Sequence, residues 1–361
     1  MCACSGKADN DKNKDTDAAQ IIYAGQFSID YPEEGYKHIH ISDGTDYICV
    51  PEGAQVKDFG YKDAVIIRLP VKEIYLAASS AMDLFIQLDA LDSIGSCSTK
   101  AADYSIEEAA ERIESGEIRY VGKYSAPDYE AIINSGCNLA IESTMITHSP
   151  EIKEELERLG LPVLVERSSY ESDPLGRLEW IRLYGALLDK EEEADAFFDA
   201  QEEKYLAVKE KLKKEENDEK PAVAFFYISS NGYVNIRKPG DYISSMIELA
   251  GGTYCPGHIE VENANALSTM NIGWEQFFAQ ASQADILIYN STIDGGLKSV
   301  DDLMSKNKLF ADFKAVKNGR VYCTDTDMFQ KSSAVCDVIT DLYAVINDGD
   351  AEELKYIYKL R

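Results

Sequence analysis

The sequence predicts an α/β fold with two Rossmann-like lobes, one long helix that joins them, and an N-terminal β-hairpin layer. Three observations carry this prediction. Strand-like and helix-like segments alternate from Lys72 to about residue 170, and the alternation starts again after residue 220. Between the two runs lies a highly charged helical stretch of about 25 residues, which spans roughly 37 Å at 1.5 Å per residue. That length is enough to reach from one globular unit to another.

We divide the 361 residues into four parts. Residues 1–20 are a signal remnant and tether, 21–188 the N-terminal lobe with its β-hairpin layer, 189–216 the interlobe helix, and 217–361 the C-terminal lobe. The polar run EENDEK at 215–220 marks the change of domain. An apolar fraction of 45% is enough to build a core in each lobe.

The first twenty residues, MCACSGKADNDKNKDTDAAQ, resemble the end of a bacterial lipoprotein signal followed by a polar tether. Cys4 fits the lipid-modified cysteine better than Cys2 because the small residue Ala3 precedes it. The apolar core of such a signal is missing, so we expect a trimmed chain; chance placement of two cysteines is the alternative. We expect disorder up to Ala19, because this polar composition cannot repay the entropy lost on ordering.

The segment 21–68 contains short alternating runs such as YKHIHIS and DYICVPEG, which indicate the β-hairpin layer. His38 and His40 share one face of a strand, but no third metal ligand stands nearby, so a hairpin surface is favoured over a metal site. The first lobe then reads as EIYLAASS, AMDLFIQLDALD, SIGSCS, SIEEAAERIESGE, RYVGKYS, DYEAIINSG, CNLAIEST, PEIKEELERLG and LPVLVERSS.

Two helices are expected at the centre of the chain. Asp173 and Pro174 mark the start of the first, because Asp can cap the free amides and Pro loses no needed donor there. Apolar residues recur at helical spacing as far as Leu188, which predicts one buried face, and Asp189 ends the helix. The long charged helix follows from Lys190. Its apolar side comprises Ala194, Phe197, Phe198, Gln201, Tyr205, Val208 and Leu212.

The second lobe repeats the alternation of strands and helices, and one of its segments is an internal repeat of a segment in the first lobe. Its segments are AVAFFYISS, DYISSMIELAG, GWEQFFAQAS, ADILIYNST, LMSKNKLFADF and RVYCTDTD, closed by the helix SSAVCDVITDLYAVIN. The segment 128–142 matches 273–289, since each is a short helix with a glutamate near its start and then a buried strand. Such pseudo-symmetry suggests that a ligand lies between the lobes.

Composition excludes several classes of function. A net charge of −28 argues against nucleic acid or an anionic membrane surface as a partner, because both would repel the chain. No segment reaches the roughly 20 apolar residues that a membrane helix needs. The cysteines after Cys4 show no C-x-x-C spacing, so a structural zinc is not expected. Cys97, Cys137 and Cys323 lie in apolar patterns and are expected to behave as small hydrophobic residues.

The order of elements from Tyr75 onward, the paired glutamate helices, ELAGG, GRVY and the single charged helix resemble a known family. They look like the substrate-binding proteins of ABC importers for ferric siderophores, haem and cobalamin. The segment SSYESDPLGRLEWIRLYGALL is similar to a lipoprotein subgroup of that family. The resemblance implies a monomeric, extracytoplasmic receptor, lipid-anchored at Cys4, that hands an iron chelate or corrinoid to an ABC permease. It implies no intrinsic cofactor and only small lobe movements.

Glu130 and Glu275 stand where the family carries one acidic residue on each lobe to dock on arginines of the permease. Two separated carboxylates can read the spacing of two cationic pockets and steer the encounter. The alternative is that each acid only stabilises the N-terminus of its helix. The resemblance favours docking.

We expect the ligand to meet loops at the carboxyl ends of the strands, where open α/β sheets place their crevice. Arg177 and Arg237 are expected to pair with carboxylates of the ligand or with a charged chelate. Alternatively, Arg177 pairs with Glu179 or Glu171 and only fixes the helix start. The other candidate contacts are hydroxyl, amide, aromatic and thioether side chains: Ser80, Met82, Tyr124, Met145, Tyr170, Asn231, Tyr233, Asn290 and Phe329.

The rival interpretation is a two-lobed enzyme, such as a metal-dependent hydrolase or a chelatase. Its candidate carboxylates would be Asp83, Glu130, Glu142 and Glu179. The sequence contains no nucleophile elbow and no phosphate loop of the G-x-x-x-x-G-K-[ST] type. A lipoprotein tether also suits a docked binding protein better than a metabolic enzyme. We therefore expect a binding protein and no catalytic residues.

Overall fold

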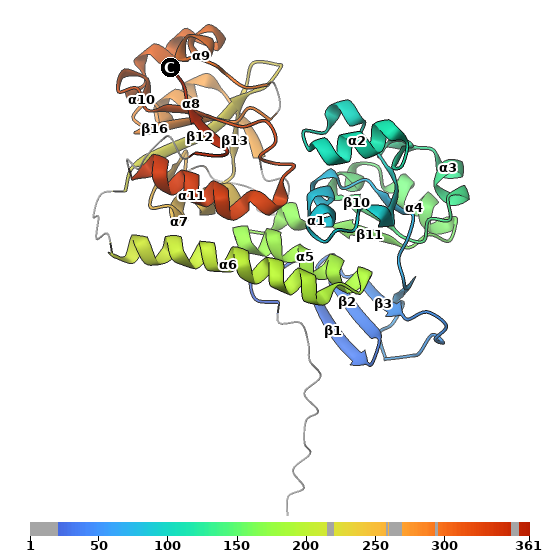
Figure 1. The fold of residues 1–361 in the computed structure, drawn as a ribbon. Coiled ribbons are helices and arrows are strands. Elements are labelled where there is room, and N and C mark those ends of the chain that lie inside the picture. Colours follow the sequence, from blue (N-terminus) through green and yellow to red (C-terminus); the bar gives the residue numbers. More distant parts are fainter. Residues whose placement is uncertain (1–20, 215–219, 258, 260–268, 293–294, 348–353) are drawn as a thin grey trace, which may run out of the picture.

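The computed structural model describes residues 21–214, 220–257, 259, 269–292, 295–347 and 354–361. It shows two α/β lobes that stand side by side on a pair of central helices (Figure 1), as the sequence predicts. Cys4 and the predicted tether lie outside the described residues. Within the described residues, no helix combines the length and the apolar character that a membrane crossing requires.

The N-terminal layer is a four-stranded sheet and therefore larger than the predicted hairpins. Its strands run in the order β1-β2-β3-β4, antiparallel except for the parallel pair β3 and β4. One face packs on the centre of the molecule, where the ring of Phe27 meets Trp180 edge-on at 5.0 Å and Tyr47 Oη donates to Val163 O at 2.7 Å. The strands are β1 Phe27–Glu33, β2 Tyr36–Ile41, β3 Asp46–Val50 and β4 Val65–Arg68.

The N-terminal lobe contains a five-stranded, fully parallel sheet in the order β11-β10-β5-β6-β7. This is the arrangement that alternating strands and helices predict. The strands are β5 Ile74–Leu76, β6 Ile94–Cys97, β7 Arg119–Tyr120, β10 Ala140–Ser143 and β11 Val163–Glu166, with a small hairpin of β8 Gly122–Lys123 and β9 Ala126–Pro127. The helices are α1 Met82–Gln87, α2 Glu107–Ser115, α3 Tyr129–Asn134 and α4 Pro150–Arg158.

The C-terminal lobe has a mixed sheet, which corrects the expectation of a second parallel lobe. Strands β12, β14, β16 and β17 are parallel, whereas β13, β15 and β18 pair antiparallel with their neighbours. The cause at β13 is a tight turn at Asn231-Gly232, where Gly232 adopts a φ of 82° and reverses the chain.

The bounds of its strands are β12 Ala222–Ile228, β13 Val234–Arg237, β14 Thr253–Cys255, β15 Thr269–Ile272, β16 Ile286–Tyr289, β17 Val321–Thr324 and β18 Ile357–Lys359. The helices of this lobe are α7 Tyr242–Leu249, α8 Trp274–Ala281, α9 Val300–Lys306, α10 Lys314–Lys317 and α11 Val335–Ile346.

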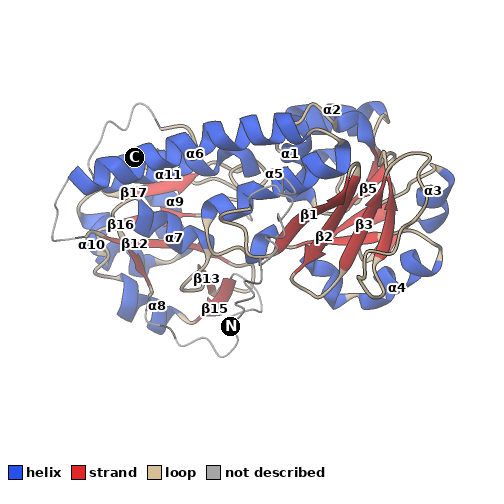
Figure 2. Ribbon diagram, turned by 90° about the horizontal axis from the view of Figure 1, so that it is seen from below, coloured by secondary structure: helices blue, strands red, loops and turns tan. Residues whose placement is uncertain are grey.

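The two central helices are α5 (Pro174–Leu188) and α6 (Glu191–Lys214). Asp173 caps α5 by accepting from Leu175 N at 2.8 Å, and Asp189 ends it in the left-handed region with a φ of 53°. Helix α6 has 24 residues and runs beneath both lobes (Figure 2). Ala194, Phe198, Tyr205 and Val208 of its predicted apolar side are buried.

Helix α5 is buried almost all round, so the prediction of a single buried face was wrong. The N-terminal sheet covers one side, α6 another, and the two lobes the rest. The segment around Tyr23 passes so close to α5 at Gly176 that a Cβ on this residue would lie 2.7 Å from Tyr23 O. Of the charged residues on this helix, Glu179 is fully buried and Arg177 nearly so.

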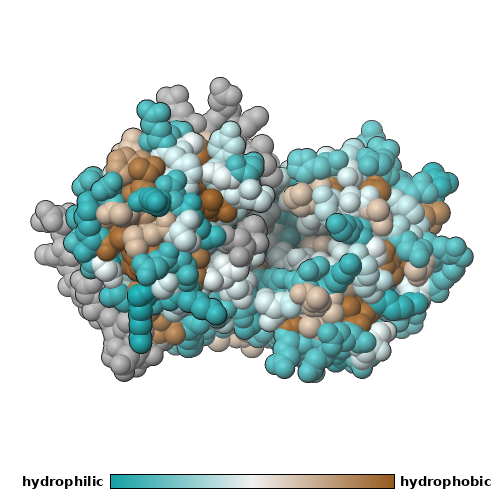
Figure 3. Space-filling model, turned by 90° about the horizontal axis from the view of Figure 1, so that it is seen from above, coloured by the Kyte–Doolittle hydropathy of each residue, from teal (hydrophilic) through white to brown (hydrophobic). Residues whose placement is uncertain are grey.

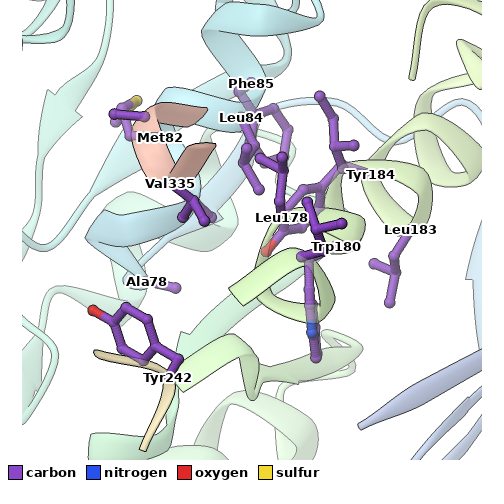
Figure 4. Close-up of a cluster of buried hydrophobic side chains, with 14 of the residues drawn as sticks. Ala78, Met82, Leu84, Phe85, Leu178, Trp180, Leu183, Tyr184, Tyr242 and Val335 are labelled. Atoms are coloured by element: carbon purple, nitrogen blue, oxygen red, sulfur yellow. The ribbon is translucent and has the colours of Figure 1, made fainter. Parts of the chain in front are cut away.

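One hydrophobic core runs through both lobes by way of α5 (Figure 4). Met82 and Phe85 come from the N-terminal lobe, Leu178 from α5, and Tyr242 and Val335 from the C-terminal lobe. The six cysteines of the described residues are free thiols, with Cys97 and Cys323 buried as predicted and Cys137 half-buried.

Hydrogen bonds also join the lobes directly. Ser332 Oγ donates to Ser80 O at 2.7 Å, and Ser333 N donates to Asp83 Oδ2 at 2.6 Å. Farther out, Gln330 Oε1 accepts from Ser105 N at 2.8 Å. The lobes therefore meet along packed and hydrogen-bonded surfaces and not only through the covalent connection.

Candidate functional site

A groove separates the two lobes on the face opposite the central helices (Figure 3). Where the lobes meet α5, a small pocket with room for about one water molecule lies between α5, α7, the start of α11 and the loop after β17. Its walls are mostly apolar, with two cationic side chains and two hydroxyl-bearing ones among them. The lining residues are Arg177, Tyr242, Met246, Met328, Phe329, Lys331, Ser332, Val335 and Val338.

Arg177 comes from the second turn of α5, and its side chain is the part of that helix that lines the pocket. The residue is only 7% exposed. Its guanidinium lies 4.7 Å from the centroid of the Tyr242 ring, in a cation–π contact that joins α5 to the C-terminal lobe. No carboxylate of the described residues lies within ion-pair distance of Arg177.

The alternative in which Arg177 only pairs with Glu171 or Glu179 is not what the structure shows. The Glu179 carboxylate accepts from the backbone amides of residues 22–24 at 2.7–2.9 Å and from Arg182 Nη1 at 3.1 Å. The Glu171 carboxylate accepts from the amides of Gly25 and Gln26 and from Trp180 Nε1. Both acids therefore hold the N-terminal segment against α5.

A second buried arginine also lies close to the Tyr242 ring. Arg237, at the end of β13, approaches the ring centroid of Tyr242 at 5.2 Å and that of Phe329 at 4.7 Å. Its Nη2 donates to Tyr242 Oη at 3.2 Å, and its Nε lies 3.4 Å from Asp241 Oδ1. Burial raises the pKa of Asp241, although the charges of Arg237 and Arg177 act in the opposite direction. We call Arg177, Arg237, Asp241 and Tyr242 the arginine cluster.

Three of the predicted ligand contacts, Arg177, Arg237 and Phe329, lie close together around Tyr242 in the structure. Ser80 lies at the lobe junction, where its carbonyl accepts from Ser332. The other predicted contacts are on separate loops and vary in exposure. Met145 is 42% and Tyr233 51% exposed, Asn231 is exposed, Tyr124 and Tyr170 are half-buried, and Asn290 is buried with its Oδ1 accepting from Thr292 N.

Met82 must be withdrawn as a ligand contact. Its side chain is fully buried in the shared core between α1 and α5 (Figure 4), because it opens α1 and faces the packed side of that helix. Tyr242, Asp241 and Lys331 were not foreseen as members of the site. The only signal for Asp241 and Tyr242 was the stretch RKPGDY, in which a turn after Arg237 brings both residues back toward it, and no local pattern indicated Lys331.

Glu130 and Glu275 are both exposed, one on each lobe, in the first turns of α3 and α8. Neither carboxylate has a hydrogen-bond or ion-pair partner among the described residues. The cap of α3 is Asp128, which accepts from Ala131 N at 3.0 Å. Glu130 is therefore not needed to cap its helix, and both acids are available to an external partner.

The carboxylates of the rival enzyme interpretation do not gather at one place. Asp83 accepts from Ser333 N and Gln87 Nε2 at the lobe junction, Glu179 holds residues 22–24, and Glu130 is on the surface. Glu142 is fully buried on β10, and burial raises its pKa to about 8. The described residues contain no group of three or more His, Cys, Asp or Glu side chains that could hold a metal ion.

Comparison with protein families matches residues 75–328 to the model described as "Periplasmic binding protein". Two similar proteins are uncharacterized lipoproteins of Methanocaldococcus jannaschii. One is 26% identical over 293 residues, which cover 78% of this chain and 66% of the relative. The other is 27% identical over 366 residues, which cover 94% of this chain and 87% of the relative.

Solved structures share the fold at low sequence identity. A periplasmic binding protein from Veillonella parvula has a TM-score of 0.63 at 16% identity and covers 90% of this chain and 98% of its own. A periplasmic heme binding protein from Pseudomonas aeruginosa has a TM-score of 0.59 at 15% identity, covering 81% and 99%. The periplasmic vitamin B12 binding protein of Vibrio cholerae has a TM-score of 0.54 at 15% identity, covering 77% and 98%.

Proposed function

Since the chain belongs to the periplasmic binding protein family, we propose that it is an extracytoplasmic solute-binding protein that delivers its cargo to an ABC permease. The cargo is an iron chelate or a tetrapyrrole-type cofactor, that is, a siderophore, haem or a cobamide. The protein has no cofactor of its own and acts as a monomer.

The observation that carries this proposal is the groove between the two lobes (Figure 3). At its floor, where the lobes meet α5, side chains of α5 and of the C-terminal lobe line the small pocket that contains Arg177 and Phe329. Apolar walls with a few convergent polar groups are typical of sites for organic ligands. The names of structural neighbours that bind heme and vitamin B12 support the same class of cargo.

The partner and the location rest on separate supports. Glu130 and Glu275 are exposed, one on each lobe, and have no partner among the described residues, as a two-point docking contact requires. Two relatives carry the name lipoprotein, which supports lipid attachment at Cys4 and an extracytoplasmic location. No observation favours the hydrolase or chelatase alternative, because its four candidate carboxylates lie in four different parts of the protein and do not form one site.

Native mass spectrometry of the protein expressed in its own host tests the proposal. We expect a co-purified small molecule of the siderophore, haem or cobamide class at one copy per chain. Calorimetric titration with a ferric siderophore, haemin and cyanocobalamin gives the affinity directly. Absence of binding to all three classes, together with turnover of an ester or phosphate substrate, would contradict it.

A further inference from the structure

One side chain, that of Gln330, joins the two lobes beside the groove by three hydrogen bonds. Its Oε1 accepts from Ser105 N at 2.8 Å and from Ser105 Oγ at 2.9 Å, and its Nε2 donates to Asp103 O at 2.8 Å. Gln330 follows β17 of the C-terminal lobe, and residues 103–105 follow β6 of the N-terminal lobe. Both loops come after the carboxyl ends of parallel strands, where open α/β sheets place their ligands. The contact therefore connects loops on the two sides of the groove.

Gln330 is held in place from within its own lobe. Its N–H and that of Lys331 donate to Asp327 O at 2.9 and 3.0 Å, which closes a tight turn. The preceding residue, Phe329, packs on Arg237 of the arginine cluster, whose guanidinium lies 4.7 Å from the ring centroid. These contacts fix the backbone at residue 330, so only the side chain has to be ordered when the contact with the other lobe forms.

The partner loop is fixed in a similar way. Tyr104 and Ile106, on either side of Ser105, are buried, and Tyr104 N donates to Ala101 O at 3.0 Å. Ser105 and Asp103 themselves are exposed, so water competes for the groups that Gln330 binds. Hydrogen bonds in such surroundings contribute only a modest net free energy, because water replaces them when they break. The contact can thus open and re-form while both loops stay folded.

Deeper in the junction, the lobes are joined by contacts of a different kind. Ser333 N donates to the buried Asp83 carboxylate, Ser332 Oγ donates to Ser80 O, and the apolar core passes through α5. Water does not reach these groups as it reaches Ser105. The loops can therefore separate at Gln330 while the base of the junction remains closed.

We propose that Gln330 is a latch: its side-chain amide holds the loops on the two sides of the groove together, and its release controls how fast cargo enters and leaves. The role in cargo exchange rests on the proposed function, whereas the latch itself does not. Because cargo passes the latch in both directions, loss of the latch accelerates binding and release alike and changes the Kd little.

Hydrogen exchange in the full-length, ligand-free protein reports the latch directly, because Gln330 Oε1 is the acceptor of the Ser105 amide. In Gln330→Ala we expect exchange at Ser105 to accelerate about 5- to 30-fold, as the loss of one or two net hydrogen bonds provides. The amides of Tyr104 and Ala110, which donate within their own segment, should keep their rates. Unchanged exchange at Ser105 would overturn the inference. Equal acceleration at all three amides would also overturn it, because Gln330 would then be a structural residue of the loop.

Stopped-flow binding of haemin, a ferric trihydroxamate and cyanocobalamin tests the exchange of cargo. For each probe that the wild type binds, Gln330→Ala should raise the association and dissociation rate constants by about the factor seen at the Ser105 amide. Rate constants equal to those of the wild type would overturn the inference and leave the proposed function standing. If the wild type binds none of the probes, the proposed function fails for these cargo classes, and hydrogen exchange decides the latch by itself.

Two further variants show whether Gln330 acts through its partner. Ser105→Ala removes the hydroxyl and keeps the amide, so it should weaken the latch less than Gln330→Ala does, and it should have no effect in the Gln330→Ala background. Additive effects of the two changes would contradict a latch made by these residues. The matched control is Gln276→Ala, because Gln276 is an exposed glutamine on α8 of the same lobe. It should leave the exchange at Ser105 and the probe kinetics unchanged.

Discussion

Glu142 lies on β10 with both carboxyl oxygens fully buried and without a hydrogen-bond partner in the described structure. Burial raises the pKa of this side chain to about 8, because the charged form has lost its water and gained nothing in exchange. Tyr75 on the neighbouring strand β5 has a buried hydroxyl, likewise without a hydrogen-bond partner. This part of the N-terminal lobe is therefore sensitive to the protonation of one residue.

We predict that Glu142 makes the protein less stable as the pH rises from about 5 to 8. Its folded-state pKa lies above the unfolded value, so the folded state binds more protons in this interval and loses stability as they leave. The slope from this one group is at most about 1.4 kcal/mol per pH unit. Glu142→Gln should flatten the pH profile of urea unfolding. Parallel profiles for the two proteins between pH 5 and 8 would contradict this.

At single sites, the sequence predicted which side chains have suitable chemistry for a ligand better than it predicted which of them are buried. Arg177 and Arg237 were recognised as ligand candidates because guanidinium groups suit charged chelates, and the structure places both against Tyr242. Met82 was chosen for its place after a strand, yet its side chain is fully buried. Whether a residue at a loop–helix boundary faces the cleft or the core depends on the rotation of the helix, and six residues of α1 are too few to show a period.

At the scale of elements, α5 acts as the attachment point for the N-terminal segment. Three backbone amides of residues 22–24 donate to the buried Glu179 carboxylate, and Tyr23 Oη donates to Glu202 on α6 at 2.5 Å. The segment leading into the N-terminal sheet is thus fixed to both central helices. Lys37 of β2 adds a second attachment through ion pairs of 2.6 Å with Asp189 and Glu191.

We predict that Glu179→Gln lowers the free energy of unfolding by about 3 to 5 kcal/mol, since it leaves buried amides and Arg182 without their shared charge. Hydrogen exchange at the amides of residues 22–24 should accelerate, and the urea midpoint should fall. Glu203→Gln is the matched control, because Glu203 is exposed on α6. A change in Glu179→Gln no larger than in the control would argue against this role.

Alternation of strands and helices was enough to predict the parallel sheet of the N-terminal lobe and the helix between the lobes. It was not enough for the edges of the C-terminal sheet. Strand β18 has three residues and pairs with β17 across more than thirty residues of chain, so no local pattern shows it. Similarly, α5 has little amphipathic character, and its burial on nearly all sides results from the N-terminal sheet, α6 and the two lobes, whose positions no helix periodicity can reveal.

At the scale of the whole molecule, each lobe carries an exposed carboxylate in the first turn of a helix, Glu130 on α3 and Glu275 on α8. If Glu130 and Glu275 each meet an arginine of the permease, their removal should slow uptake without affecting folding or cargo affinity. We predict that Glu130→Ala and Glu275→Ala each reduce uptake by cells that carry the cognate permease, and that the double variant is worse. Each lost contact costs roughly 2 to 5 kcal/mol of docking free energy if it is buried.

The controls for docking are acids of the same kind elsewhere on each lobe. Glu151 and Asp301 are exposed residues in the first turns of α4 and α9. Proteins with Glu151→Ala or Asp301→Ala should support normal uptake. This result would show that the slower uptake of the Glu130 and Glu275 variants does not come from a general loss of surface charge. Normal uptake with the Glu130→Ala, Glu275→Ala double variant would show that these residues have no docking role.

The apolar core that passes from α1 through α5 to α7 and α11 also determines how the protein melts. Proteins built of separate domains commonly unfold in separate steps, whereas a single cooperative unit melts at once. Here α5 packs on α1 of the N-terminal lobe and on α7 and α11 of the C-terminal lobe, so the loss of either lobe exposes apolar side chains of this helix. We therefore expect one calorimetric transition, with a van't Hoff enthalpy equal to the calorimetric enthalpy. Two resolved peaks would show that the lobes are thermodynamically independent. A single transition would show that the two lobes form one folding unit, in which the loss of either lobe unfolds the other.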